Sequence, residues 1–88
     1  MAPFTLYTDA SKIAVGGVLL QRDASGVERA IFFFSKKLSA AQRNYSTFER
    51  ECLAVICALK HFRIYLLAQP FWLRTDHRAL QWLFSIEP

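Results

Sequence analysis

The sequence lacks a long apolar run, a secretory leader pattern and a set of pairable cysteines. No stretch of about 18 residues is free of charge, so no membrane-spanning helix and no membrane partner are expected. The N-terminal MAPFTLYTDASK has no basic region followed by an apolar one, which argues against a secretory signal. Cys52 and Cys57 lie on one expected helix and point in different directions, so they are not expected to pair. We therefore expect reduced thiols and an intracellular location, in cytoplasm or nucleus, without secretion.

Acidic residues are also scarce, with 7 Asp and Glu against 11 Lys and Arg, a net charge of +4. This mildly basic balance permits a nucleic-acid partner without requiring one. The 88 residues suffice for one small domain and contain no internal repeat or low-complexity tract.

Three short segments at the start are typical of an antiparallel meander. Strands are expected at Phe4–Thr8, Ile13–Gln21 and Val27–Ser35. Gly16 and Gly17 inside the second segment indicate a bulge or a close approach by other backbone. A turn is expected at 23–26, where Gly26 tolerates a positive φ.

The second half predicts a helix, a strand and another helix. Ser39–Gln42 and Ser46–Glu49 each fit a capping box, and the main helix is expected to start at the second and to extend to Ala68. A strand at Phe71–Thr75 and a helix at His77–Phe84 would follow. The resulting order, β-β-β-α-β-α, predicts a mixed α/β fold. One sheet face would be poorly covered, and we expect the natural domain to continue beyond Pro88.

Glu51 occupies an unusual position on the main helix. At about 100° per residue, one apolar arc collects Phe48, Cys52, Val55, Ile56, Leu59, Phe62 and Leu66. Glu49 lies on the polar flank of this arc with Lys60, whereas Glu51 projects between Ala58 and Phe62, at the arc's edge. A carboxylate there is costly unless it is paired, hydrogen-bonded or bound to a metal.

Three carboxylates stand where they can converge. Asp9 follows the first strand, Asp76 follows the fourth, and Glu51 lies early in the helix. If the first and fourth strands are parallel neighbours, the two aspartates emerge at one sheet edge and the helix can bring Glu51 to them. Such a cluster repels itself unless a hard divalent cation neutralises it, which favours Mg²⁺. Two such ions suit in-line displacement at phosphorus.

Each carboxylate also has an ordinary explanation. Asp9 can bond its own turn, as the similar tripeptide at Asp23 suggests, and Asp76 can be the N-cap of the second helix. Glu51 can meet an arginine or a backbone N–H. On this structural hypothesis the three side chains lie far apart.

The combination of motifs resembles the ribonuclease H domain of reverse transcriptases, and in particular Gypsy-like LTR retrotransposon Pol polyproteins. The specific part is the ordered set TDAS, NYS-x₂-E-x-E-x-LA and TDH. The resemblance covers nearly the whole chain. It is carried by residues 8–11, 16–19, Gln21, Ser35, Leu38, 44–46, Glu49, Glu51, Leu53, Ala54, 62–63, 65–66, 75–77 and Leu80.

The resemblance implies a ribonuclease H-like fold and an endonuclease that cuts the RNA strand of RNA–DNA hybrids with two Mg²⁺ ions, or Mn²⁺ in their place. Asp9 matches the first catalytic aspartate, which would bridge both metals, and Glu51 and Asp76 match the next two carboxylates. It also implies polymerase and integrase domains of the same polyprotein as partners, and a retroelement particle as a location. The family pattern adds a fourth acidic residue, a fifth strand and a last helix. We interpret residues 1–88 as the N-terminal part of the domain, lacking those elements, and expect weak or absent cleavage by this chain alone.

Substrate contacts are expected along the segment that leads into the helix. The candidates are Lys36, Lys37, Arg43, Asn44, Tyr45 and Arg50, with a solvated loop as the alternative. His77 can touch phosphate or be satisfied at the helix start, and Ser11 can orient Asp9 or cap its turn. Trp72 and Trp82 are expected in the core. The competing hypothesis for the whole chain is an inactive remnant that binds nucleic acid or a protein partner.

Overall fold

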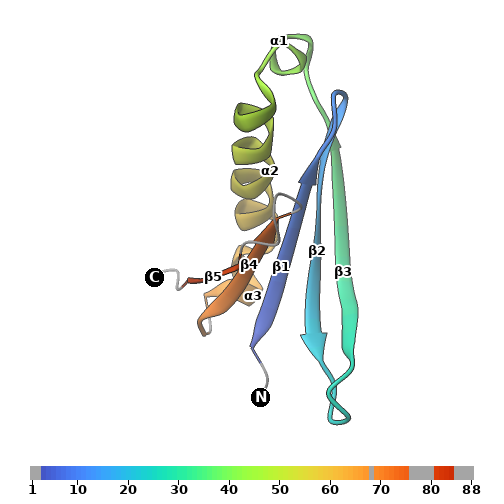
Figure 1. The fold of residues 1–88 in the computed structure, drawn as a ribbon, viewed down its shortest axis with the longest axis vertical. Helices are drawn as coiled ribbons and strands as arrows, with labels where there is room; N and C mark the ends of the chain where they lie inside the picture. Colours follow the sequence, from blue (N-terminus) through green and yellow to red (C-terminus); the bar gives the residue numbers. More distant parts are fainter. Residues whose placement is uncertain (1–2, 68, 76–80, 85–88) are drawn as a thin grey trace.

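The chain folds around one mixed sheet with helices on one of its faces. The computed structural model describes residues 3–67, 69–75 and the backbone of 81–84. The sheet has the order β3-β2-β1-β4-β5 (Figure 1). Its strands are β1 (Phe4–Ala10), β2 (Ala14–Arg22), β3 (Glu28–Lys37), β4 (Phe71–Thr75) and β5 (Gln81–Phe84). The helices are α1 (Ala40–Arg43), α2 (Thr47–His61) and α3 (Arg63–Leu66). No helix of the described part is long and apolar enough to cross a membrane.

The strand pairing confirms the predicted meander and the predicted neighbours. β1 pairs antiparallel with β2, and β2 pairs antiparallel with β3. β1 also pairs with β4 in parallel, with Thr8 opposite Thr75. The ends of β1 and β4 therefore lie side by side, as the hypothesis of a shared site requires.

The expected close approach by other backbone occurs at Gly16, where a Cβ would lie 3.3 Å from Phe34 O, whereas Gly17 lies close to side chains of two other elements. A Cβ at Gly17 would lie 2.7 Å from Cε1 of Phe34 and 3.2 Å from the Cβ of Ala58 on α2. The bulge predicted near the glycines lies instead further along β2, between Leu19 and Leu20. Glycine at position 17 therefore lets α2 pack tightly onto the middle of the sheet.

Both capping boxes are confirmed, and the second one starts α2 as predicted. Ser46 Oγ accepts a hydrogen bond from Glu49 N at 3.1 Å, and Glu49 Oε1 accepts one from Ser46 N at 2.9 Å. The helix ends earlier than expected, at His61, because Phe62 adopts φ −102° and ψ 14° and a separate turn, α3, follows. This break directs both Phe62 and Leu66 into the core.

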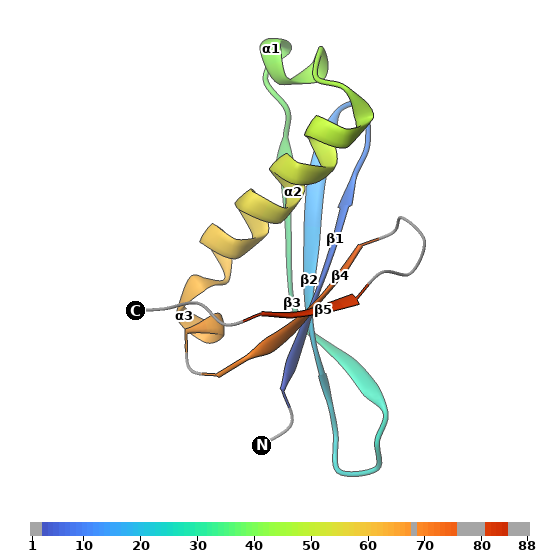
Figure 2. The same cartoon turned by 60° about the vertical axis from the view of Figure 1, so that its left-hand side comes forward.

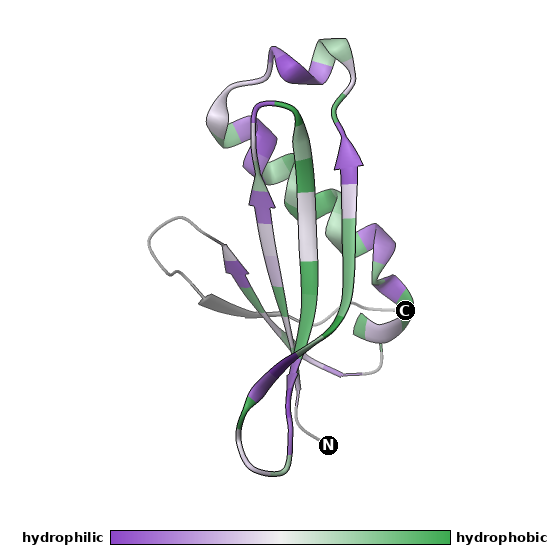
Figure 3. Cartoon of the chain, turned by 90° about the vertical axis from the view of Figure 1, so that its right-hand side faces the viewer, coloured by the Kyte–Doolittle hydropathy of each residue, from purple (hydrophilic) through white to green (hydrophobic). Residues whose placement is uncertain are grey.

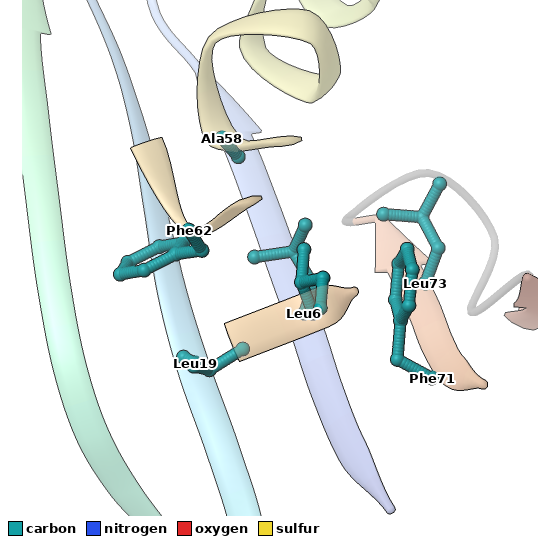
Figure 4. Packing of buried hydrophobic residues seen from close by; sticks show 7 residues of the cluster. Leu6, Leu19, Ala58, Phe62, Phe71 and Leu73 are labelled. Atoms are coloured by element: carbon teal, nitrogen blue, oxygen red, sulfur yellow. The ribbon is translucent and has the colours of Figure 1, made fainter. Parts of the chain in front are cut away.

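The buried face of α2 differs from the predicted apolar arc. Phe48 and Ile56 are 74% and 49% exposed, so their placement in the core was wrong. The buried residues of α2 are Ala54 and Ala58. Small side chains are buried because the helix lies close to Gly17, which leaves no room for larger ones. Figure 4 shows Ala58 and Phe62 above Leu6 and Leu19, beside Phe71 and Leu73 of β4.

The prediction of a C-terminal helix at His77–Phe84 was wrong for its last four residues. They form β5, which pairs antiparallel with β4, with Phe71 opposite Phe84. The free edge of β4 satisfies the backbone groups of a segment whose aromatic residues also favour a strand. Residues 77–80 lie outside the described part. The sequence predicted a fifth strand only beyond Pro88, whereas β5 is already the fifth strand of the described sheet. The domain limits and the last helix expected beyond Pro88 stay predictions.

In the part of the chain that the structure describes, no helix covers one face of the sheet, as the sequence predicted. α2 and α3 lie on the other face, and Figures 2 and 3 show the sheet from different sides with α2 behind it in Figure 3. Trp72 is 38% exposed because it alternates with buried Phe71 and Leu73, so its predicted core position was wrong. Nothing is described of the Trp82 side chain. An ion pair, Arg74 Nη2 to Glu28 Oε1 at 2.7 Å, links β4 to β3.

Replacing Ala58 by leucine tests the tight helix–sheet contact. Ala58 is fully buried against Gly17, so Ala58→Leu should lower the free energy of unfolding by about 1–3 kcal/mol through overpacking. The matched control is Ala41→Leu on the exposed surface of α1, which should change it by less than about 0.5 kcal/mol. Urea unfolding measures both, and an Ala58→Leu variant as stable as the control would contradict the packing.

The Asp23 turn predicts a dependence on pH. Hydrogen bonds from the Ser25 hydroxyl, from Arg29 and from Val27 N lower the pKa of Asp23 from 3.8 to about 2. A lowered pKa stabilises the fold above the ordinary pKa, and that contribution is lost as the pH falls through the folded value. Asp23→Asn should therefore be less stable than the wild type above pH 3.8, with the difference fading towards pH 2. Unfolding curves at several pH values measure this, and a difference that is constant with pH would contradict it.

Candidate metal and nucleic-acid site

Asp9 lies inside β1, one residue before its end, rather than after the strand. It pairs with Gly16 of β2, and its side chain is exposed. Asp9 Oδ1 accepts a hydrogen bond from Ala10 N at 2.9 Å. This single local bond leaves most of the oxygen lone pairs of the carboxylate available for a further ligand.

Asp9 and Glu51 border the same small hollow. It is lined by Thr8, Asp9, Glu51, Ala54 and Thr75. Its volume is about 10 Å³, close to the least that one water molecule requires. Among the described residues, the lining holds two acidic side chains and no basic one. The hypothesis that these carboxylates lie far apart is therefore not supported for Asp9 and Glu51.

Glu51 reaches this hollow because it belongs to the buried stripe of α2. Glu51, Ala54 and Ala58 follow one another at spacings of three and four residues, which places them on one helix face. Ala54 and Ala58 are 1% and 0% exposed, and Glu51 is half-buried. Glu51 therefore lies nearer the centre of the packed face than the predicted arc placed it.

The neighbouring Glu49 has a structural task. It is exposed, and its carboxylate closes the capping box with Ser46. The hydrogen bond from Ser46 N is the main cause that lowers the pKa of Glu49. Glu49 therefore stabilises the start of α2, which agrees with its predicted role apart from Glu51.

The third predicted carboxylate, Asp76, lies outside the described residues, as does His77. Thr75, the residue before Asp76, lines the hollow and pairs with Thr8. No group of three or more His, Cys, Asp or Glu that could hold a metal occurs within the described ranges 3–67 and 69–75. The three-carboxylate cluster thus stays a prediction, of which the structure describes two members.

Thr8, Ala54 and Thr75 were missed as lining residues. The signal for Thr8 and Thr75 was present, since each directly precedes a candidate aspartate and the two strands were expected to be parallel neighbours. Ala54 could be found only by knowing which face of α2 is buried.

Ser11 caps the turn between β1 and β2. Its hydroxyl accepts hydrogen bonds from Ile13 N at 3.3 Å and Ala14 N at 3.1 Å and donates to Ala14 O at 3.2 Å. Of the two roles considered for Ser11, the structure supports the cap. A second, more open hollow of about 190 Å³ extends from Asp9 past Ser11 to Gly16 and Ser35.

The basic candidates gather at the end of the molecule where β1 ends. Figure 1 shows α1, the start of α2 and the β1–β2 turn at this end. The side chains of Lys36, Lys37, Arg43, Asn44 and Tyr45 are exposed there. Arg50 instead donates hydrogen bonds to Tyr45 O at 2.6 Å and Thr47 Oγ1 at 3.5 Å, so it holds the loop before α2.

The donors at the hollow fit a hard divalent cation. Carboxylate oxygens are the ligands that Mg²⁺ prefers, and Asp9 and Glu51 supply them where no described basic residue competes. Thiol and imidazole ligands, which suit softer metals, are absent from the lining of the hollow in the described part.

Comparison with known proteins gives a consistent assignment. The family model described as an RNase H-like domain found in reverse transcriptase matches residues 1–88. The chain is 42% identical over 84 residues to the retrovirus-related Pol polyprotein from transposon 297 of Drosophila melanogaster, covering 96% of this chain and 8% of that protein. It is 47% identical over 77 residues to the transposon Tf2-3 polyprotein of Schizosaccharomyces pombe, covering 85% of this chain and 6% of that protein. The chain thus spans less than a tenth of the length of these relatives. With its mixed sheet and the order of its motifs, it belongs to the family of RNase H-like domains found in reverse transcriptases.

Proposed function

We propose that this domain is a metal-dependent endonuclease that cleaves the RNA strand of RNA–DNA hybrids. The observation that carries the proposal is the shared hollow of Asp9 and Glu51, lined also by Thr75, directly before Asp76. The family membership supports it. The relatives are Pol polyproteins, so we propose that the domain acts beside polymerase and integrase domains of such a polyprotein.

In this proposal Asp9, Glu51 and Asp76 hold divalent cations. A bound pair of Mg²⁺ or Mn²⁺ ions supplies a charge clamp for displacement at phosphorus. The role of the chain is to fix the carboxylates in place: strand pairing holds Asp9 at the end of β1 beside Thr75, and the packing of α2 sets Glu51.

Hybrid binding would use the basic end of the molecule. The side chains of Lys36, Lys37 and Arg43 are exposed and form no ion pair with any described residue, so they are available to phosphates. Asn44 and Tyr45 lie in the loop beside them, where polar and aromatic groups can contact sugars. Ser11 and Arg50 support this surface by holding the adjoining turn and loop. His77 would add a contact next to Asp76.

A second candidate function is an inactive module that binds nucleic acid or a protein partner. The open sheet face favours it, since Phe33 is 69% exposed and Trp72 38% exposed there. Large exposed apolar surfaces often mark interaction sites.

Metal binding can be tested without measuring activity. Mn²⁺ titration of the wild type, followed by paramagnetic broadening of amide signals, should affect the ends of β1 and β4 and the first turns of α2. Asp9→Asn and Glu51→Gln should each weaken Mn²⁺ binding by about tenfold or more, because each removes a charged ligand. Glu49→Gln is the matched control, since it changes the same charge two residues away and should leave binding intact. Equal binding by Glu51→Gln and the control would remove Glu51 from the site.

Cleavage is measured on a hybrid whose RNA strand is end-labelled, at high protein concentration and long incubation. The wild type should give RNA products only with Mg²⁺ or Mn²⁺. Asp9→Asn should reduce the rate by about 100-fold or more, because a lost carboxylate leaves the cations misplaced, whereas Glu49→Gln should retain it. Products formed equally by wild type and Asp9→Asn would exclude Asp9 from the mechanism. Salt-sensitive hybrid binding with no metal-dependent products would favour the binding module instead.

A further inference from the structure

A groove separates β3 from the neighbouring flank of α2. Its volume is about 720 Å³, within the range of binding sites for small ligands and peptide side chains. None of its lining residues lines the hollow of Asp9 and Glu51. The residues important here are Phe34, Lys36, Ile56, Cys57, Lys60 and His61. We refer to it as the β3 groove.

The floor of the β3 groove is apolar and well supported. The Phe34 ring stacks on His61 with centroids 4.9 Å apart and meets Phe62 edge-on at 5.8 Å. Ile56 is 49% exposed into solvent, and Cys57 beside it is half-buried. An aliphatic side chain at Ile56 and a fixed aromatic floor suit the apolar side chains of a ligand.

The rim of the β3 groove is basic. Lys36 on β3 and Lys60 on α2 both line it, are exposed and pair with no acidic group in the part of the chain that the structure describes. The described lining contains no Asp or Glu. A ligand that carries carboxylates would therefore complement the charge of the rim.

The groove runs along an unpaired strand edge. Among the described strands, β3 is the last of the sheet, so one edge of its ten residues has no partner strand there. Phe32 and Phe33 near its middle are 41% and 69% exposed. Soluble proteins usually shield such edges, and an unshielded edge readily accepts a further strand.

We propose that the β3 edge and the β3 groove bind an extended peptide segment in which every second residue faces the groove, and these facing residues are apolar and acidic in turn. Its backbone adds as a strand to β3. Its apolar side chains lie on Phe34 and Ile56, and its carboxylates meet Lys36 and Lys60. Single-stranded nucleic acid fits less well because the floor is aliphatic in part, and a second copy of the chain would bring two basic rims together. This proposal does not depend on hybrid cleavage, and because Lys36 is also proposed to contact hybrid phosphates, the test uses Lys60, which lies outside that surface.

The probe is a fluorescein-labelled peptide of about eight residues, long enough for one strand, in which Val and Glu occupy every second position in turn and Ser stands between them. The comparison peptide carries Lys in place of each Glu. The Glu peptide should bind the wild type, and Lys60→Glu should weaken it by about tenfold and favour the Lys peptide. Lys12→Glu is the matched control, because Lys12 is exposed in the β1–β2 turn and lies outside the groove. Circular dichroism verifies that each variant is folded.

The two cysteines give a second, internally controlled readout. Cys57 lines the β3 groove, whereas Cys52 on the same helix is exposed outside it. Bound Glu peptide should slow alkylation of Cys57 by iodoacetamide several-fold and leave Cys52 unchanged. The proposal is overturned if neither peptide binds, if both cysteines are protected equally, or if Lys12→Glu weakens binding as much as Lys60→Glu. It is also overturned if Cys57 is protected by concentration-dependent dimerisation without peptide, or if oligothymidylate alone binds in a Lys60-dependent way.

Discussion

The packing of α2 onto the middle of the sheet is the contact on which the rest of the structure depends. Ala58 lies against Gly17, and Phe62 joins Leu6 and Leu19 in the main core cluster. Because a Cβ at Gly17 would come within 3.2 Å of Ala58, the helix can take this depth only above glycine. Because α2 packs this closely, Glu51, which lies two turns before Ala58 on the same helix face, reaches the end of β1. A shallower helix would leave this carboxylate in solvent, where it could contribute little to a shared site.

The parallel pairing of β1 with β4 is the second contact that positions the site. Thr8 lies opposite Thr75, so the ends of β1 and β4 lie at the same level of the sheet. This pairing joins segments more than sixty residues apart, and α2 is the connection that makes it possible. The same element therefore covers the core, links the two strands and supplies an acidic residue. Because one helix has these three roles, a chain of 88 residues can place carboxylates from separate segments beside one hollow.

Local signals in the sequence predicted much of this arrangement, and long-range pairing accounts for what they missed. The capping boxes at Ser39 and Ser46 and the strand at Phe71–Thr75 were predicted correctly because their causes lie within a few residues. The buried face of α2 was predicted wrongly because the prediction placed large apolar residues such as Phe48 in the core. Small residues are buried instead, because α2 packs against Gly17, which lies on β2. β5 was missed because it forms by pairing with the edge of β4, and the local sequence pattern does not reveal this contact. For the site, the order of motifs selected Asp9 and Glu51 correctly as neighbours of one hollow, and Asp76 lies outside the described residues.

The described acidic residues differ in where they lie. Five of the seven acidic residues are described, and three of them lie away from the hollow, each with a structural task. Asp23 closes the β2–β3 turn with Arg29, Glu28 pairs with Arg74 across the sheet, and Glu49 caps α2. Asp9 and Glu51 border one hollow whose described lining offers no basic residue. In the proposed function, a divalent cation bound by these two residues would offset the repulsion between their carboxylates.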